Sequence, residues 1–160
     1  MSDKQPPLTI MIPLGGVGSR FQKVHLRRNI QLDPPLPNPA PIIAQEGYAS
    51  PKPFVNVLGK SMILWVIDSL KLRPDDALVI IYDPGFIARK YWEPICSAHK
   101  CVSLVELPGP TRGAAETVLL GLRGINRALR SRPVMLVDGD SFYEEDIVSA
   151  YAIHRQPTPS

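Results

Sequence analysis

The sequence predicts an α/β fold in which helices cover both faces of a mostly parallel sheet. Two observations lead to this prediction: short apolar runs recur along the chain, and segments with helical spacing lie between them. The run Ala77–Tyr82 is continuously apolar and β-branched, as in a strand that is covered on both faces. Strands that alternate with helices form parallel sheets, and such sheets bind ligands beyond the carboxyl ends of their strands.

Four strands are expected, each a short apolar run bounded by turn residues. They lie at Leu8–Ile12, Ala77–Tyr82, Cys101–Leu107 and Pro133–Val137. We expect Pro13 and the glycines after it to close the first strand.

Helices are expected where apolar residues recur at helical spacing. They lie at 61–72, 85–95, 113–131 and 144–155. We expect Ser61 to cap the first helix and Pro94 to lie near the end of the second. Gly121 and Gly124 are expected to weaken the middle of the third.

The composition is that of an ordinary globular protein. The chain of 160 residues is 44% apolar and 21% charged, enough for one domain or part of one. Its net charge of +3 includes no Lys/Arg-rich block, so neither nucleic acid nor a membrane surface is expected as a partner. Cys96 and Cys101 match neither a disulfide framework nor a zinc site, and we expect both to be reduced packing residues. Because no signal-peptide pattern opens the chain and no apolar stretch is long enough to span a bilayer, a cytoplasmic location is expected.

A glycine-rich loop follows the first strand. Gly15, Gly16 and Gly18 fall within four positions and are followed at once by Ser19 and Arg20. Backbone N–H groups without a neighbouring Cβ can approach a phosphate closely, and a guanidinium beside them suits a polyphosphate. An ordinary glycine turn without a ligand is the alternative for this stretch.

Two common phosphate loops do not match. A dinucleotide-binding G-x-G-x-x-G would need glycine where Phe21 stands, and no G-x-x-x-x-G-K-[ST] string occurs. An oxidoreductase is further disfavoured because Asp83 is the only candidate for a ribose-binding acid after the second strand.

Lys52 stands between Pro51 and Pro53. Both prolines restrict the backbone, so we expect Lys52 on a stiff, extended segment that holds its charge in place. The alternative is a solvated loop lysine.

Two carboxylates, Asp138 and Asp140, follow the fourth strand directly. Mg²⁺ takes carboxylate oxygens together with substrate phosphates, so this pair is a candidate metal site. Alternatively, Asp140 or Ser141 caps a helix that starts near Glu144.

The stretch after the third strand places small residues at the start of a helix. Gly113, Ala114 and Ala115 would let a planar base or a ribose approach closely, and Glu116 or Thr117 would hydrogen-bond it. The alternative is an ordinary helix start with helix-forming alanines.

Together these stretches resemble the nucleotidylyltransferase family that makes nucleotide-sugars. The resemblance rests on "IPLGGVGSRF" followed by "PKPFVNVLGKSMILWVIDSL", with "GAAET" and "DGDSFY" in support, and it covers nearly all the chain except Val24–Gln45. It implies a Rossmann-like, three-layer α/β domain of glycosyltransferase-A type. The implied reaction is attack of a sugar 1-phosphate, or a similar phosphate, on the α-phosphorus of a nucleoside triphosphate, with release of pyrophosphate.

The resemblance also implies roles for individual residues. Leu14–Gly16 would face the nucleotide, Gly18, Ser19 and Arg20 would hold the triphosphate, and Gly113 would lie beneath the base.

Arg20 and Lys52 would be the catalytic residues, Lys52 by stabilising charge at the α-phosphate. Asp140 would bind Mg²⁺, with Asp138 as the weaker candidate ligand. Transfer of this kind needs mainly positioning and charge neutralisation, which agrees with the residue types.

Two departures from the family pattern stand out. Many members carry Gln where this chain has Leu107, which leaves the nucleobase open. The chain also ends soon after Asp140, so the family's C-terminal half, with its sugar-binding residues and second metal carboxylate, is expected to be absent. The alternative function is therefore a truncated, non-catalytic relative that binds nucleotide or regulates a partner. Nothing in the sequence indicates the sugar or an oligomeric state.

The segment Val24–Gln45 carries five prolines between positions 34 and 41 and is expected to be polyproline-like or disordered. Its removal would leave "GGVGSRFQKEGYASPKPF", which fits the spacing of the family. Valine codons begin with GT and glutamine can be encoded by CAG, so our hypothesis is an in-frame retained intron. The alternative is a genuine insertion over the mouth of the site.

Overall fold

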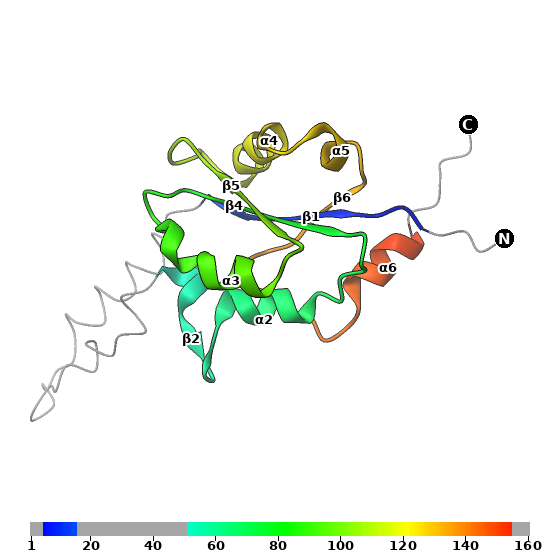
Figure 1. Ribbon diagram of the computed structural model, residues 1–160, viewed down its shortest axis with the longest axis horizontal. Helices are drawn as coiled ribbons and strands as arrows, with labels where there is room; N and C mark the ends of the chain where they lie inside the picture. The colour runs from blue at the N-terminus through cyan, green and yellow to red at the C-terminus, as the bar shows by residue number, and fades with distance from the viewer. Residues whose placement is uncertain (1–4, 16–50, 155–160) are drawn as a thin grey trace, which may run out of the picture.

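The computed structural model describes residues 5–15 and 51–154, so the segment Val24–Gln45 lies outside the described residues. A four-stranded sheet with helices on both faces confirms the α/β prediction, and every pair of neighbouring strands in it is parallel (Figure 1). Across the sheet the strands are β5 (Val102–Glu106), β4 (Ala77–Tyr82), β1 (Thr9–Leu14) and β6 (Val134–Leu136).

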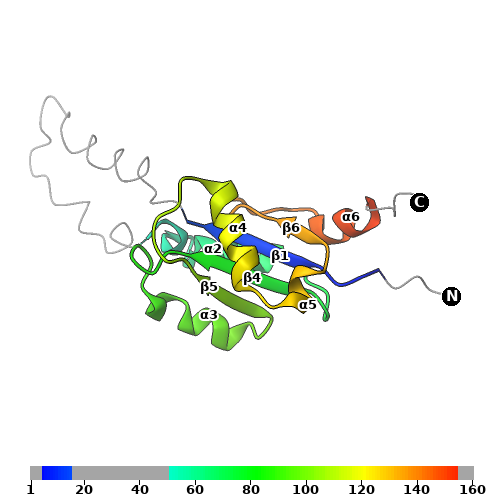
Figure 2. The same ribbon diagram turned by 90° about the horizontal axis from the view of Figure 1, so that it is seen from above.

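The helices form a layer on each side of this sheet (Figures 1 and 2). One layer holds α4 (Ala114–Gly124) and α5 (Arg127–Arg130), and Figure 2 shows α4 lying over β1 and β4. The other holds α2 (Met62–Ser69), α3 (Glu93–Ala98) and α6 (Ile147–His154). Two short 3₁₀ turns, η2 (Lys52–Phe54) and η3 (Arg89–Tyr91), and an antiparallel hairpin of β2 (Asn56–Val57) and β3 (Lys60–Ser61) complete the described part.

The apolar character of the strands follows from burial on both faces. Ile10 and Ile12 of β1 pack in the larger core under α2 and α3, whereas Met11 between them packs in the smaller core under α4. Because alternate side chains of a strand point to opposite faces, a strand between two helical layers needs apolar residues at every position.

The first strand is longer than expected. β1 continues through Pro13, which pairs with Ile81, so the prediction that Pro13 closes the strand is wrong. Alternate residues of β1 bond to alternate neighbours, and the missing N–H of Pro13 faces the β6 side, where the last pair is Met11 with Leu136. The pairing of Pro13 with β4 does not need that N–H, and on the β6 side the ladder ends once the Val137 N–H has donated to the Met11 carbonyl.

The third predicted helix is two helices. α4 ends at Gly124, Ile125 is buried in an extended conformation, and the side chain of Asn126 caps α5 by accepting from the Leu129 N–H at 2.9 Å. The glycines have a packing role: a Cβ on Gly121 would lie 2.2 Å from Ile81 Cδ1. α4 therefore approaches the sheet more closely than a helix with side chains at these positions could.

Other helix ends also differ from expectation. The helix predicted at 85–95 is wrong over most of its length, since η3 lies there and α3 begins only at Glu93. Pro94 therefore lies in the first turn of α3, where a missing N–H costs nothing, and not near the helix end. Ser61 occupies the N-cap position of α2 but makes no side-chain capping bond. Cys96 and Cys101 are both free thiols, and Cys96 packs against the larger core as predicted, whereas Cys101 is exposed, so its prediction as a packing residue is wrong.

A buried ion pair ties the amino ends of two strands together. Asp76, just before β4, accepts from the backbone N–H of Leu8 at 2.8 Å and from the guanidinium of Arg73 at 2.7 Å. Burial alone would raise the pKa of Asp76, but these hydrogen bonds and the charge of Arg73 hold the pKa below its ordinary value. The carboxylate thus aligns β1 with β4 at the end opposite to the expected site.

We predict that Asp76→Asn lowers the free energy of unfolding by about 2–3 kcal/mol, because donors that face the carboxylate lose a charged acceptor. Urea unfolding measures this. Since the folded pKa is depressed, the wild-type advantage is complete above about pH 4 and disappears as the pH falls through the folded pKa. Asp68→Asn, at an exposed ion pair, is the control and should cost under about 1 kcal/mol; equal losses would contradict the assigned role of Asp76.

We also predict that Gly121→Ala destabilises the protein by about 1–3 kcal/mol despite the better helix propensity of alanine, because its Cβ would meet Ile81. Thermal unfolding measures the loss. Adding Ile81→Val, which removes Cδ1, should recover part of it. Gly113→Ala is the matched control, since a Cβ there meets nothing within 4 Å, and its stability should stay unchanged.

Candidate functional site

The predicted site residues that the structure describes gather at the carboxyl edge of the sheet. β1 ends at Leu14, β6 leads directly into Asp138–Asp140, and α4 begins at Ala114 beside them. Because β1 is parallel to both β4 and β6, the loops after these strands emerge at the same edge. Gly16, Gly18, Ser19 and Arg20 lie outside the described residues.

The Asp-Gly-Asp turn packs against the end of β1. A Cβ on Gly139 would lie 2.3 Å from Leu14 Cδ2 and 3.1 Å from Ile12 Cγ2. Glycine at this position therefore lets the turn close onto the strand that leads into the glycine loop. Asp138 and Asp140 on either side of it are exposed.

Gly15 packs against the first turn of α4. It is buried, and a Cβ there would lie 2.3 Å from Thr117 Oγ1 and 2.9 Å from Thr111 Oγ1. The two hydroxyls are 2.6 Å apart, and Thr117 Oγ1 also donates to the Gly113 carbonyl at 3.2 Å. The first glycine of the loop is thus explained by contact with this chain's own threonines, and the buried Thr117 is not presented to a ligand.

Lys52 is held in a turn. The backbone N–H groups of Phe54 and Val55 donate to the carbonyls of Pro51 and Lys52 at 2.7 and 3.2 Å, so the prediction of an extended segment is wrong. Pro53 lies within the first turn of this 3₁₀ helix, where its missing N–H leaves no bond unmade. The segment is nevertheless stiff, as the two prolines indicate.

Aromatic packing anchors that turn to the larger core. The Phe54 ring lies edge-on to Trp92, with centroids 4.7 Å apart, and 5.0 Å from the Tyr91 ring. Trp92 is fully buried. The lysine two residues before Phe54 therefore starts from a fixed backbone position, although its side chain is partly exposed.

Lys52 and Asp140 form an ion pair across 88 residues of sequence. Lys52 Nζ lies 2.5 Å from Asp140 Oδ2, and the two side chains are 39% and 47% exposed. The structure thus joins two of the predicted charged groups, Lys52 and Asp140, at the edge of the sheet. At this exposure the pair contributes little to stability, and each charge can exchange its partner for a ligand.

Asp140 does not cap the following helix. α6 begins at Ile147, and the Asp146 carboxylate accepts from the backbone N–H and the hydroxyl of Ser149 at 3.0 and 2.8 Å. These hydrogen bonds hold the pKa of Asp146 below its ordinary value. The capping alternative for the Asp-Gly-Asp stretch therefore does not apply: Asp146, which the sequence analysis did not single out, makes the hydrogen bonds at the start of α6.

Two other acidic residues considered as nucleotide ligands, Glu116 and Asp83, have hydrogen-bond partners within the chain. The backbone N–H of Arg112 donates to Glu116 at 2.6 Å, and together with the guanidinium it holds the pKa of Glu116 below its ordinary value. Asp83 is buried and closes a turn by accepting from the Gly85 N–H at 2.8 Å. Leu107 is buried under α4. Gly113 faces open space.

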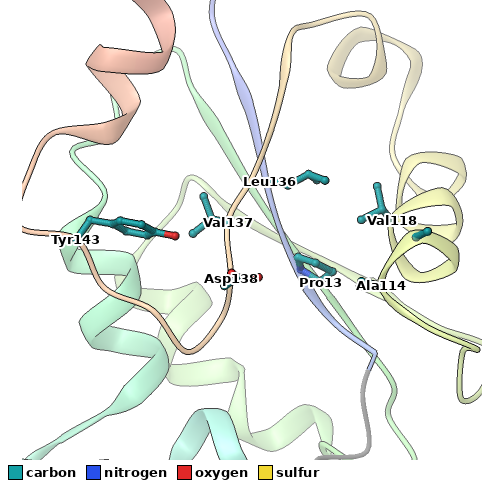
Figure 3. A pocket seen from close by; sticks show the side chains of 8 residues that line it. Pro13, Ala114, Val118, Leu136, Val137, Asp138 and Tyr143 are labelled. Atoms are coloured by element: carbon teal, nitrogen blue, oxygen red, sulfur yellow. The ribbon is translucent and has the colours of Figure 1, made fainter.

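An open, mainly apolar pocket of about 550 Å³ lies beside these residues. Its lining comes from β1, α4, β6 and the segment after β6, and consists of Pro13, Ala114, Ala115, Val118, Leu136, Val137, Asp138 and Tyr143. Asp138 and Pro13 lie between Tyr143 on one side and Ala114 and Val118 on the other (Figure 3). The pocket has the size and apolar lining of small-molecule sites, with a carboxylate in its wall.

At this edge of the sheet, Asp138 and Asp140 are the candidate metal ligands among the described residues. Within residues 5–15 and 51–154, no group of three or more His, Cys, Asp or Glu side chains could hold a metal ion. Asp138 and Asp140 offer hard oxygen ligands, and Mg²⁺ is commonly bound by one or two carboxylates plus substrate phosphates. The residues present fit a magnesium ion that arrives with a phosphate.

No protein-family model, curated protein or solved structure matches this chain significantly. In the part of the chain that the structure describes, no helix has the length and hydrophobicity needed to cross a membrane.

We predict a weak coupling between Lys52 and Asp140. In a double-mutant cycle with Lys52→Met and Asp140→Asn, the coupling free energy should stay below about 1 kcal/mol and vanish in 1 M salt. The same cycle on Arg73 and Asp76, where the carboxylate is buried, is the comparison and should give a larger, salt-resistant value. A strong Lys52–Asp140 coupling would mean that the pair serves folding.

Proposed function

We propose that the chain is a magnesium-dependent nucleotidyltransferase that transfers a nucleoside monophosphate from a nucleoside triphosphate to a sugar 1-phosphate or a related phosphate. A phosphate oxygen of the acceptor would attack the α-phosphorus, the bond from that phosphorus to the β-phosphate would break, and pyrophosphate would leave. This is the reaction of the family that the sequence resembles, and its fold type would be the Rossmann-like, glycosyltransferase-A arrangement.

The ion pair of Lys52 and Asp140 carries the proposal. It brings the cation expected at the α-phosphate and the carboxylate expected at the metal to 2.5 Å, at the carboxyl edge of the sheet. Transfer of this kind needs a cationic side chain and a bound metal ion side by side, because negative charge must be neutralised on the oxygens of the α-phosphate and on the leaving pyrophosphate.

The surroundings support a nucleotide as the ligand. Leu14 and Gly15 lead into the glycine loop, whose N–H groups and Arg20 would hold the triphosphate. The pocket between β6 and α4 offers apolar walls for a nucleoside, with the Asp138 carboxylate at its border with the phosphate side. Ala114 and Ala115 line it without bulky side chains.

Asp140, with Asp138 as its neighbour, would hold Mg²⁺ together with the phosphates. The ion would supply charge neutralisation on the phosphate oxygens. Lys52, fixed by the turn at Pro51–Phe54, would stabilise charge at the α-phosphate.

The test is release of pyrophosphate from each nucleoside triphosphate with a panel of sugar 1-phosphates, in Mg²⁺ and then in EDTA. We expect Mg²⁺-dependent release, and a fall in rate of about 100-fold or more for Lys52→Ala and for Asp140→Ala, because each removes a charge that faces the reacting phosphates.

Lys60→Ala is the matched control. Lys60 is also a partly exposed lysine paired with an aspartate, Asp68, but it lies on the hairpin, and the rate should stay unchanged. Turnover that survives both Lys52→Ala and Asp140→Ala would contradict the proposal. Binding of a nucleoside triphosphate without release of pyrophosphate from any acceptor would instead assign the non-catalytic alternative.

A further inference from the structure

We propose that Lys52 determines the specificity of this site for a metal–polyphosphate complex over a free divalent cation, by occupying the carboxylate that the cation needs. The inference rests on the proposed function and concerns how its ligands bind. It follows from the Lys52–Asp140 contact, since a lysine Nζ 2.5 Å from Asp140 Oδ2 takes a position at which a cation would bind that oxygen.

The local charges explain why the metal–polyphosphate complex is preferred over the free cation. Lys52 contributes +1 and Asp138 and Asp140 contribute −2, so the three together carry a net charge of −1. A free divalent cation gains the attraction of the carboxylates but meets the repulsion of the ammonium group a few ångströms away. A metal–polyphosphate complex supplies an anion for Lys52 and a cation for Asp140 at once, so one ion pair is exchanged for two.

The geometry makes this exchange feasible. Both side chains are partly exposed, so their pairing holds them in place only weakly. The Lys52 backbone is fixed by η2 and by the packing of Phe54 on Trp92, so the ammonium group stays within reach when its partner changes. Gly139 holds the Asp140 backbone against Leu14 in the same way.

The experiment compares two probes on the full chain. Binding of Mn²⁺ alone is titrated by the electron paramagnetic resonance signal of free Mn²⁺, and binding of the preformed Mn²⁺–tripolyphosphate complex is measured by calorimetry. In the wild type we expect the complex to bind at least about tenfold more tightly than the free ion. Lys52→Met should raise the affinity for free Mn²⁺ about fivefold, because a repelling charge is removed, and weaken binding of the complex.

Three further variants make the outcome specific. Lys52→Arg keeps the charge and should keep the discrimination. Lys60→Met removes a positive charge from the comparable Lys60–Asp68 pair and should change either affinity by less than twofold. Asp140→Asn should weaken binding of both probes, which locates the metal at this carboxylate. Circular dichroism and thermal unfolding of each variant verify that the fold is intact.

The two proposals fail in different ways. If Asp140→Asn weakens binding but Lys52→Met leaves the affinity for free Mn²⁺ unchanged or lower, the specificity role of Lys52 is overturned and the proposed function stands. Both proposals are overturned if neither probe binds to the wild type or to Lys52→Met. They are also overturned if Asp140→Asn leaves the affinity for both probes unchanged.

Discussion

The parallel pairing of β1 with both β4 and β6 is the constraint on which the rest of the molecule depends. It places the carboxyl ends of three strands at one edge and so brings Leu14 and the Asp-Gly-Asp turn together. The start of α4 reaches the same edge because α4 follows β5, which is parallel to β4. The parallel pairing also buries both faces of the sheet, because the crossover helices lie on opposite sides. Two glycines complete the arrangement: the missing Cβ of Gly15 makes room for Thr111 and for Thr117 of α4, and that of Gly139 makes room for Leu14.

The ion pairs at the two ends of the sheet differ in burial and in role. At the amino end, Asp76 is buried, has several donors, and holds β1 and β4 in alignment. At the carboxyl end, Lys52 and Asp140 are each partly exposed and pair through a single contact. A buried pair cannot lose a partner without a large penalty, whereas an exposed pair can exchange partners for a ligand. The difference separates the charges that hold the fold from those available for chemistry.

Much of the fold could be predicted because the responsible forces are local and periodic. The run Ala77–Tyr82 is a strand over the residues predicted, since burial on both faces leaves a continuous apolar signal. The errors arose where tertiary context outweighed a local rule. Pro13 stays in β1 because its missing N–H faces away from β4, the strand with which it pairs. The helix predicted at 113–131 divides because Ile125 is drawn into the core.

The sequence by itself determined the α/β class, the places where bare backbone is needed, and the residue types suited to phosphate and metal. Only the tertiary structure decided which groups meet. Lys52 lies in η2 and Asp140 follows β6, and no local pattern encodes a contact across 88 residues. The structure likewise decided that the neighbour of Gly15 is Thr117, because the sequence shows that a Cβ is missing but not which group fills its space.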